Sequence, residues 1–200
     1  MHEFIKFDRT PHLEGSRLQE GDEDLSQIPF KKMKGRWIVV EEKFDGGNSG
    51  ISFPFAELKT QSRGHYLEGG DHSHFNMFKK WAACHQDIMF DRLGDQYIMF
   101  GEWMLAKHSV FYNQLPHYFL EFDIWDRSQE GWLDTPSRKI ILGDAPVLPV
   151  KVLYEGECPG SLEELLEDIR PSVAKNPNWI HDLQHSAERA YKGRKDYNWE

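Results

Sequence analysis

The stretch that most constrains this chain of 200 residues is 36–55, which reads RWIVVEEKFDGGNSGISFPF. Its first part has the alternation of a β-strand, so that every second residue from Trp37 to Lys43 lies on one face. Residues 45–48 are strong turn formers. Residues 51–53 then have the pattern of a returning strand. We therefore predict a hairpin whose first strand ends at Lys43.

The side chains around this lysine suit chemistry at a phosphorus centre. A lysine amine attacks only when it is deprotonated, and burial or a nearby cation favours the neutral amine. Asp45 would lie on the same face of the strand, where it can position the amine or a metal ion. Gly46 and Gly47 allow a ligand to approach the backbone closely, and Asn48 offers both a donor and an acceptor.

Composition narrows the class of protein. The length and apolar content suit one globular domain with a real core. No apolar run approaches the length of a membrane span, and the first ten residues have no signal-peptide core, so we expect a soluble, cytoplasmic protein with no membrane partner. The net charge of −9 argues against a bulk cationic nucleic-acid binder and leaves room for a local basic groove.

Two charged residues stand out after the lysine. Arg63 lies between two small residues at the expected exit of a strand, where its planar fork has room to reach phosphate or ribose oxygens. Glu102 interrupts the strongly apolar strand 96–106, and a charge there is costly without a partner. Taken singly, the arginine suits an ordinary surface position and the glutamate suits a structural ion pair.

An aromatic residue follows in the next predicted strand, 116–126. Alternation places Phe122 on one face with Leu120 and Ile124, and Asp123 on the other. Packing in the core is the simplest role for such a ring. Stacking on a nucleobase is the functional alternative, because the face of the ring can pair with any base.

These residues resemble a known family. Lys43-Phe44-Asp45-Gly46-Gly47-Asn48 resembles the Lys-x-Asp-Gly-x-Asn nucleotidyl-acceptor motif of the covalent nucleotidyltransferases, which are the ATP-dependent RNA and DNA ligases and the mRNA capping enzymes. Ser-Arg-Gly around Arg63 resembles motif Ia, Gly-Glu at Glu102 resembles motif III, and Phe-Asp at Phe122 resembles motif IIIa. The four signals occur in family order, and the stretch 107–112 resembles RNA ligases more than the other two classes.

The resemblance implies a fold and a set of roles. The fold would be an α+β nucleotidyltransferase (ATP-grasp-like ligase) fold with largely antiparallel, curved sheets and peripheral helices. Lys43, Glu102 and Phe122 would converge on one cleft. Lys43 would be the catalytic nucleophile and Glu102 a metal ligand, and the nucleotide would be bound by Asp45, Gly46, Asn48, Arg63, Glu102 and Phe122.

The resemblance also implies an activity, that of an ATP-dependent RNA ligase. Its cofactors would be ATP and Mg²⁺ or Mn²⁺, and its substrate an RNA with 5′-phosphate and 3′-hydroxyl ends. Lys43 would form a covalent lysyl-AMP, the AMP would move to the RNA 5′-phosphate, and the 3′-hydroxyl would then seal the phosphodiester. Two alternatives remain open: a GTP-using capping-type transferase, and a non-catalytic nucleotide- or RNA-binding module derived from a ligase.

One departure from the family pattern bears on the domain. Motif IV, an acidic residue that binds catalytic metal, and motif V, a strand with two lysines for the triphosphate, are not found before Glu200. We therefore expect residues 1–200 to form an adenylylation domain that is incomplete at its C-terminus. Without the motif V lysines, charge on the phosphates is only partly neutralised, so we expect slow adenylylation or none unless further polypeptide supplies motifs IV and V.

Overall fold

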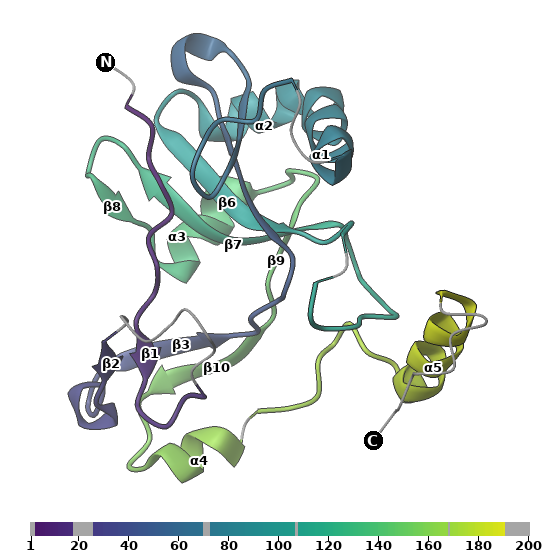
Figure 1. Cartoon of the computed structure of the whole chain (residues 1–200). Helices are drawn as coiled ribbons and strands as arrows, with labels where there is room; N and C mark the ends of the chain where they lie inside the picture. The colour runs from purple at the N-terminus through teal and green to yellow at the C-terminus, as the bar shows by residue number, and fades with distance from the viewer. Residues whose placement is uncertain (1–2, 18–25, 70–72, 107, 168, 191–200) are drawn as a thin grey trace.

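The computed structural model describes residues 3–17, 26–69, 73–106, 108–167 and 169–190. Two β-sheets with helices on their outer faces make up this part of the chain (Figure 1). The larger sheet has the strand order β5-β4-β6-β7-β8, and β9 also pairs with β7. The smaller sheet pairs β10 with β3, and a separate short pair joins β1 and β2.

The elements have the following bounds: β1 His12–Leu13, β2 Gln27–Ile28, η1 Phe30–Lys32, β3 Trp37–Glu41, β4 Gly47–Ser52, η2 Pro54–Ala56, β5 Lys59–Ser62, α1 Ser73–Cys84, α2 Gln86–Leu93, β6 Tyr97–Trp103, β7 Phe119–Asp126, β8 Gly131–Trp132, α3 Thr135–Leu142, β9 Leu148–Pro149, β10 Val152–Glu157, α4 Leu162–Glu167 and α5 Trp179–Ala190.

The expected α+β architecture is confirmed. In the two main sheets every strand pair is antiparallel except β7 with β9. The strands predicted around Glu102 and Phe122 are present as β6 and β7, the two central neighbours of the larger sheet. Among the described helices, none combines the length and the apolar character needed to cross a membrane.

The predicted hairpin around Lys43 is wrong. β3 ends at Glu41, two residues before the lysine, and β4 begins at Gly47 in the other sheet. The cause is Phe44, which is only 2% exposed because it is buried in a cluster with Leu120 of β7 and with Met104, the residue that follows β6. Burying a phenylalanine side chain contributes about 1.5–3 kcal/mol, so this contact draws the chain from one sheet across to the other.

The helices cover the sheets as their apolar stripes require. α1, α2 and α3 pack on one face of the larger sheet, and α4 packs against the smaller one (Figure 1). The main core contains the buried residues Ile51, Phe53, Leu67, Phe75, Phe78, Ala82, Met89, Leu93, Met99, Trp103, Phe119, Ile124, Leu142 and Val147. The opposite face of the larger sheet is therefore the one left for polar side chains such as Glu102.

A β-bulge in β7 changes the predicted face of Phe122. The register with β6 shifts between Phe100 and Gly101, which pair with Asp123 and Glu121 and leave Phe122 as the extra residue. Ile124 consequently lies in the main core, whereas Phe122 packs in the cluster that contains Phe44. The shared face of Phe122 and Ile124, expected from strict alternation, is wrong for this reason.

A buried arginine joins the two sheets. Arg138 on α3 is 4% exposed and carries the one guanidinium in a group of three carboxylates. Its Nη2 lies 2.5 Å from Glu41 Oε1 at the end of β3. Its Nε lies 3.3 Å from Glu121 Oε1, and its Nη1 lies 3.7 Å from Asp123 Oδ1, both on β7. The small sheet is thus linked through α3 to the large one.

The charges in this group do not balance, and the carboxyl pKa values reflect it. Burial raises the pKa of Glu121 to about 8, although Arg138 opposes the change and Glu41 and Asp123 add to it. Burial likewise raises the pKa of Asp123 to about 6, again against Arg138. One guanidinium cannot neutralise three carboxylates, of which Glu121 is fully buried, so the native state favours a protonated form of at least one of them.

The raised pKa of Glu121 predicts a pH-dependent stability. In the folded chain its pKa is about 8, against an ordinary value of 4.5, so its stabilising contribution is complete below 4.5 and is lost as the pH rises toward 8. Between pH 6.5 and 8 the wild type should lose about 2 kcal/mol more of its free energy of unfolding than Glu121→Gln does. Urea denaturation at both pH values measures this. The exposed Glu163→Gln serves as control, and identical pH profiles for wild type and Glu121→Gln would contradict the prediction.

Candidate functional site

Glu102 is the centre of the candidate site. It lies in β6 directly opposite Asn48 of β4, near the ends of both strands. Burial raises the pKa of Glu102 to about 7, and the nearby cation of Lys43 is the strongest opposing influence. Asp45 raises this pKa further. The Gly46 amide lowers it by donating a hydrogen bond to the carboxylate, and Arg63 lowers it by its charge. Four of the predicted residues, Lys43, Asp45, Gly46 and Arg63, therefore influence the carboxyl of a fifth, Glu102.

Lys43 occupies the exposed side of this group. It follows β3 and precedes the buried Phe44, so the extended chain directs its side chain away from the hydrophobic cluster. Its amine is close enough to Glu102 to act on the pKa of that carboxyl. The Lys43 side chain is thus exposed, while its backbone lies between β3 on one side and the buried Phe44 on the other.

Asp45 is held by the loop that follows β6. Its Oδ2 accepts hydrogen bonds from the Ser109 amide at 2.8 Å, the Ser109 hydroxyl at 2.6 Å and the Val110 amide at 3.0 Å. Burial alone would raise the pKa of Asp45, but these bonds outweigh it and the pKa is lowered. The Asp45 amide in turn donates to the Tyr112 hydroxyl at 3.0 Å. Asp45 thus fixes part of the loop that borders the site.

Gly46 is needed for a close approach. A Cβ at this position would lie 2.6 Å from Met104 Sδ and 2.8 Å from the Trp103 carbonyl oxygen, too close for any side chain. Neither Gly46 nor Gly47 has a positive φ, so the role assigned to them as turn residues is wrong. The absence of a side chain lets the Gly46 amide reach Glu102.

Two acceptor oxygens at the site have no partner among the described residues. These are Glu102 Oε2 and Asn48 Oδ1, both buried and carried by residues that face each other across β4 and β6. Buried acceptors are normally hydrogen-bonded, so this pair is suited to a donor or cation that arrives with a ligand. Carboxylate and amide oxygens are the ligands that Mg²⁺ and Mn²⁺ prefer, so the residues fit a divalent ion. Over the part of the chain that the structure describes, no group of three or more His, Cys, Asp or Glu side chains is placed to hold a metal by itself.

Arg63 and Phe122 flank this centre. Arg63 follows the last residue of β5, which lies beside β4, and its Nε donates to the Phe7 carbonyl at 3.3 Å. Phe122 is half-buried and joins the site through the cluster that includes Phe44, next to Lys43. The structure thus gathers five of the predicted residues around the carboxylate of Glu102: Lys43, Asp45, Gly46, Asn48 and Arg63. It places Phe122 in the hydrophobic cluster that contains Phe44.

A comparison with protein families matches residues 36–191 to the RNA ligase family. The chain belongs to this family. The match covers Lys43, Arg63, Glu102 and Phe122, the four positions at which the sequence resembles ligase motifs.

Solved structures of an RNA ligase from Naegleria gruberi have the same fold. The structure with pyrophosphate superposes with a TM-score of 0.57 at 17% sequence identity, over 69% of this chain and 42% of that one. A mutant with AMP and Mn gives 0.56 at 18%, over the same shares. Another mutant, without ligand, gives 0.56 at 19%, over 74% of this chain and 45% of that one. This RNA ligase family member therefore spans less than half the length of those chains. No curated protein matches it.

Two aromatic residues of this RNA ligase family site were not predicted. The Phe7 ring lies 5.0 Å from that of Phe122 and 5.4 Å from that of Phe100, on the same side of the sheet. Phe7 was missed because its contacts join it to residues far away in the sequence, and it lies in no helix or strand. Tyr112 was missed because its contact with Asp45 joins positions far apart in the sequence. Lys107, at the start of the ligase-like stretch 107–112, lies outside the described residues.

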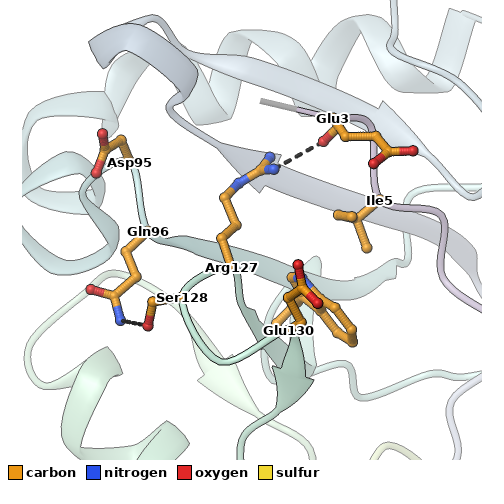
Figure 2. A pocket seen from close by; sticks show the side chains of 8 residues that line it. Glu3, Ile5, Asp95, Gln96, Arg127, Ser128 and Glu130 are labelled. Atoms are coloured by element: carbon orange, nitrogen blue, oxygen red, sulfur yellow. Dashed lines mark hydrogen bonds between the residues drawn. The ribbon is translucent and has the colours of Figure 1, made fainter. Parts of the chain in front are cut away.

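The groove drawn in Figure 2 is separate from this site. It has a volume of about 710 Å³ and lies where β6 begins and β7 ends, the far end of both strands from Glu102. The Arg127 guanidinium reaches across it to the Glu3 carbonyl at 2.9 Å. None of the predicted site residues lines it; the lining residues are Glu3, Ile5, Asp95, Gln96, Trp125, Arg127, Ser128 and Glu130.

The bonds of Asp45 predict a local loss of order on its removal. Asp45→Ala removes the carboxylate oxygen that accepts three hydrogen bonds, which should lower the free energy of unfolding by about 2 kcal/mol and speed proteolytic cleavage within 105–118. Because the pKa of Asp45 is lowered, this difference should be present at neutral pH and shrink as the pH falls through that pKa. Urea denaturation and limited proteolysis measure the two effects. Asp91→Ala, at an exposed position of α2, should change neither; equal behaviour of both variants would refute the role of Asp45.

Proposed function

We propose that this chain is the adenylylating part of an ATP-dependent RNA ligase and that Lys43 is its nucleophile. The observation that carries the proposal is the buried Glu102 carboxylate, near which Lys43, Asp45 and Arg63 all lie and which faces Asn48. An ordinary surface lysine would not explain the half-protonated carboxyl beside it or the two buried acceptor oxygens that lack hydrogen-bond partners. A nucleotide-binding site would explain them, because the nucleotide and its divalent ion supply the donors and the cation that these oxygens lack.

In the first proposed step the Lys43 amine attacks the α-phosphorus of ATP. A bond from Nζ to phosphorus forms, the bond to the bridging oxygen breaks, and pyrophosphate leaves with the electron pair. Arg63 would bind phosphate or ribose oxygens through its planar guanidinium. Asn48 Oδ1 and Glu102 Oε2 would accept hydrogen bonds from the nucleotide or hold Mg²⁺ or Mn²⁺. A bound divalent ion would supply charge neutralisation at the phosphate oxygens.

In the later proposed steps the AMP group moves to an RNA 5′-phosphate, and a 3′-hydroxyl then displaces AMP to close the phosphodiester. Further cations are needed to stabilise the charge in these steps. The 200 residues contain no match to the motif V lysines, so we propose that further polypeptide supplies motifs IV and V. Self-adenylylation by this chain alone should accordingly be slow.

Covalent labelling tests the nucleophile. Incubation with α-³²P-ATP and Mg²⁺ or Mn²⁺ should give a slowly formed, acid-labile phosphoramidate on the chain, and Lys43→Ala should reduce it to background because this variant lacks the proposed acceptor amine. Lys80→Ala, at an exposed position of α1, is the matched control and should label as the wild type does.

Label that survives Lys43→Ala would refute the assignment. Reversible ATP binding without any adduct, in the chain and in a C-terminally extended form, would favour the non-catalytic nucleotide-binding module instead. Labelling by α-³²P-GTP in preference to ATP would favour a capping-type transferase.

Stacking of the nucleobase on Phe122 gives a second test. Phe122→Ala should raise the Kd for ATP about tenfold, within the range that base–aromatic stacking contributes. Phe122→Tyr keeps the ring face and should bind within about twofold of the wild type. Titration with a fluorescent ATP analogue measures both. Equal affinity of the alanine variant and the wild type would exclude a stacking role.

A further inference from the structure

Arg138 contacts two segments of the chain that carry residues of the candidate site. On one side it forks onto Glu41, with Nη2 at 2.5 Å from Oε1 and Nη1 at 3.3 Å from Oε2. On the other, Nη1 donates to the backbone carbonyl of Phe122. One buried side chain thus connects the end of β3 with the bulge of β7.

The contact with Phe122 compensates for the bulge. Phe122 is the extra residue between the Phe100 and Gly101 pairings, so it has no directly opposed partner on β6. The extra residue of a bulge interrupts the hydrogen-bond ladder, and the local backbone needs another source of order. Arg138 supplies a charged donor at this carbonyl. It therefore holds the backbone conformation that turns the Phe122 ring toward Phe7 and the cluster containing Phe44.

The contact with Glu41 holds the strand that precedes the lysine. Glu41 is the last residue of β3, two positions before Lys43, and its side chain is only 20% exposed. The Thr135 hydroxyl, one turn before Arg138 on α3, donates to the same carboxylate at 3.3 Å. Because β3 pairs only with β10 in its sheet, these bonds are its direct polar link to α3, which packs on the larger sheet.

We infer that Arg138 is a positioning residue for both halves of the nucleotide site: through Glu41 it fixes the backbone that carries Lys43, and through the Phe122 carbonyl it fixes the ring that meets the base. This inference rests on the proposed function. A purely stabilising role accounts for the group poorly, because buried ion networks can often be replaced by apolar residues without loss of stability. A planar fork that must satisfy two differently oriented acceptors explains why an arginine is used.

The two contacts can be tested separately. Glu41→Gln replaces a carboxylate oxygen by an amide donor, so one bond of the fork is lost while Phe122 keeps its partner. The rate of self-adenylylation at saturating ATP should fall about tenfold, with the Kd for ATP within twofold of the wild type. Arg138→Lys retains a charge but cannot span both acceptors. It should lower the rate about tenfold and also raise the Kd about tenfold.

The measurements are single-turnover labelling with α-³²P-ATP and titration with a fluorescent ATP analogue, both with Mn²⁺ and at a temperature where circular dichroism shows each variant folded. Arg92→Lys, which alters an exposed pair with Asp144 on the outer surface, is the matched control and should leave both quantities unchanged. If Arg138→Lys does not fold, Glu41→Gln alone decides: a reduced rate at unchanged Kd supports the inference. An unchanged rate in a Glu41→Gln variant of lowered stability overturns it.

Failure of the proposed function would be recognised independently. It fails if the wild type and Lys43→Ala label alike, or if the chain and a C-terminally extended form of it both bind ATP and never label. In that case the inference is decided on affinity: Arg138→Lys must weaken ATP binding and Glu41→Gln must not. Equal affinities for both variants and the wild type would overturn it.

Discussion

The burial of Phe44 is the contact on which the arrangement of the site depends. It anchors the chain as it passes from the small sheet to the large one, in a cluster that includes Leu120 of β7. Neighbours in an extended chain point in opposite directions, so burying residue 44 turns residues 43 and 45 outward. Lys43 is thereby exposed beside Glu102, and Asp45 reaches the loop at Ser109. One apolar side chain sets the direction of two charged ones.

The strands around the site could be predicted from the sequence, but their connections could not. Apolar runs placed Glu102 and Phe122 in strands, and the order of short motifs brought Lys43, Arg63 and Glu102 into one hypothesis. The pattern at 36–55 also suits a hairpin, because local turn chemistry says nothing about which sheet the second strand joins. That choice is made by the burial of Phe44 against Leu120, a contact between positions far apart in the chain.

The bulge at Phe122 was unpredictable for a related reason. A strict two-residue period assigns each side chain to a face, and a single extra residue shifts every later assignment. The shift becomes visible only when Phe100 is paired with Asp123 and Gly101 with Glu121. Phe7 and Tyr112 escaped prediction because their roles are contacts with Phe122 and Asp45 across the fold. The motif residues were recognisable because their chemistry is local, whereas the residues that support them act at a distance.

The two polar groups of the chain differ in their balance of charge. In the group around Arg138, three carboxylates share one buried guanidinium, and the charge excess is relieved within the protein by raised carboxyl pKa values. In the group around Glu102, the cations of Lys43 and Arg63 lie near the carboxyls of Glu102 and Asp45, and two acceptor oxygens have no hydrogen-bond partner among the described residues, so acceptors are left for a ligand. Both groups contain buried polar atoms without a hydrogen-bond partner among the described residues. They differ in that the first is tied to the fold by the bonds of Arg138 to Glu41 and to the Phe122 carbonyl, whereas the second borders the exposed Lys43. Glu41 of the Arg138 group and Lys43 of the Glu102 group are two residues apart, so the contacts of Arg138 act on the backbone next to the candidate site.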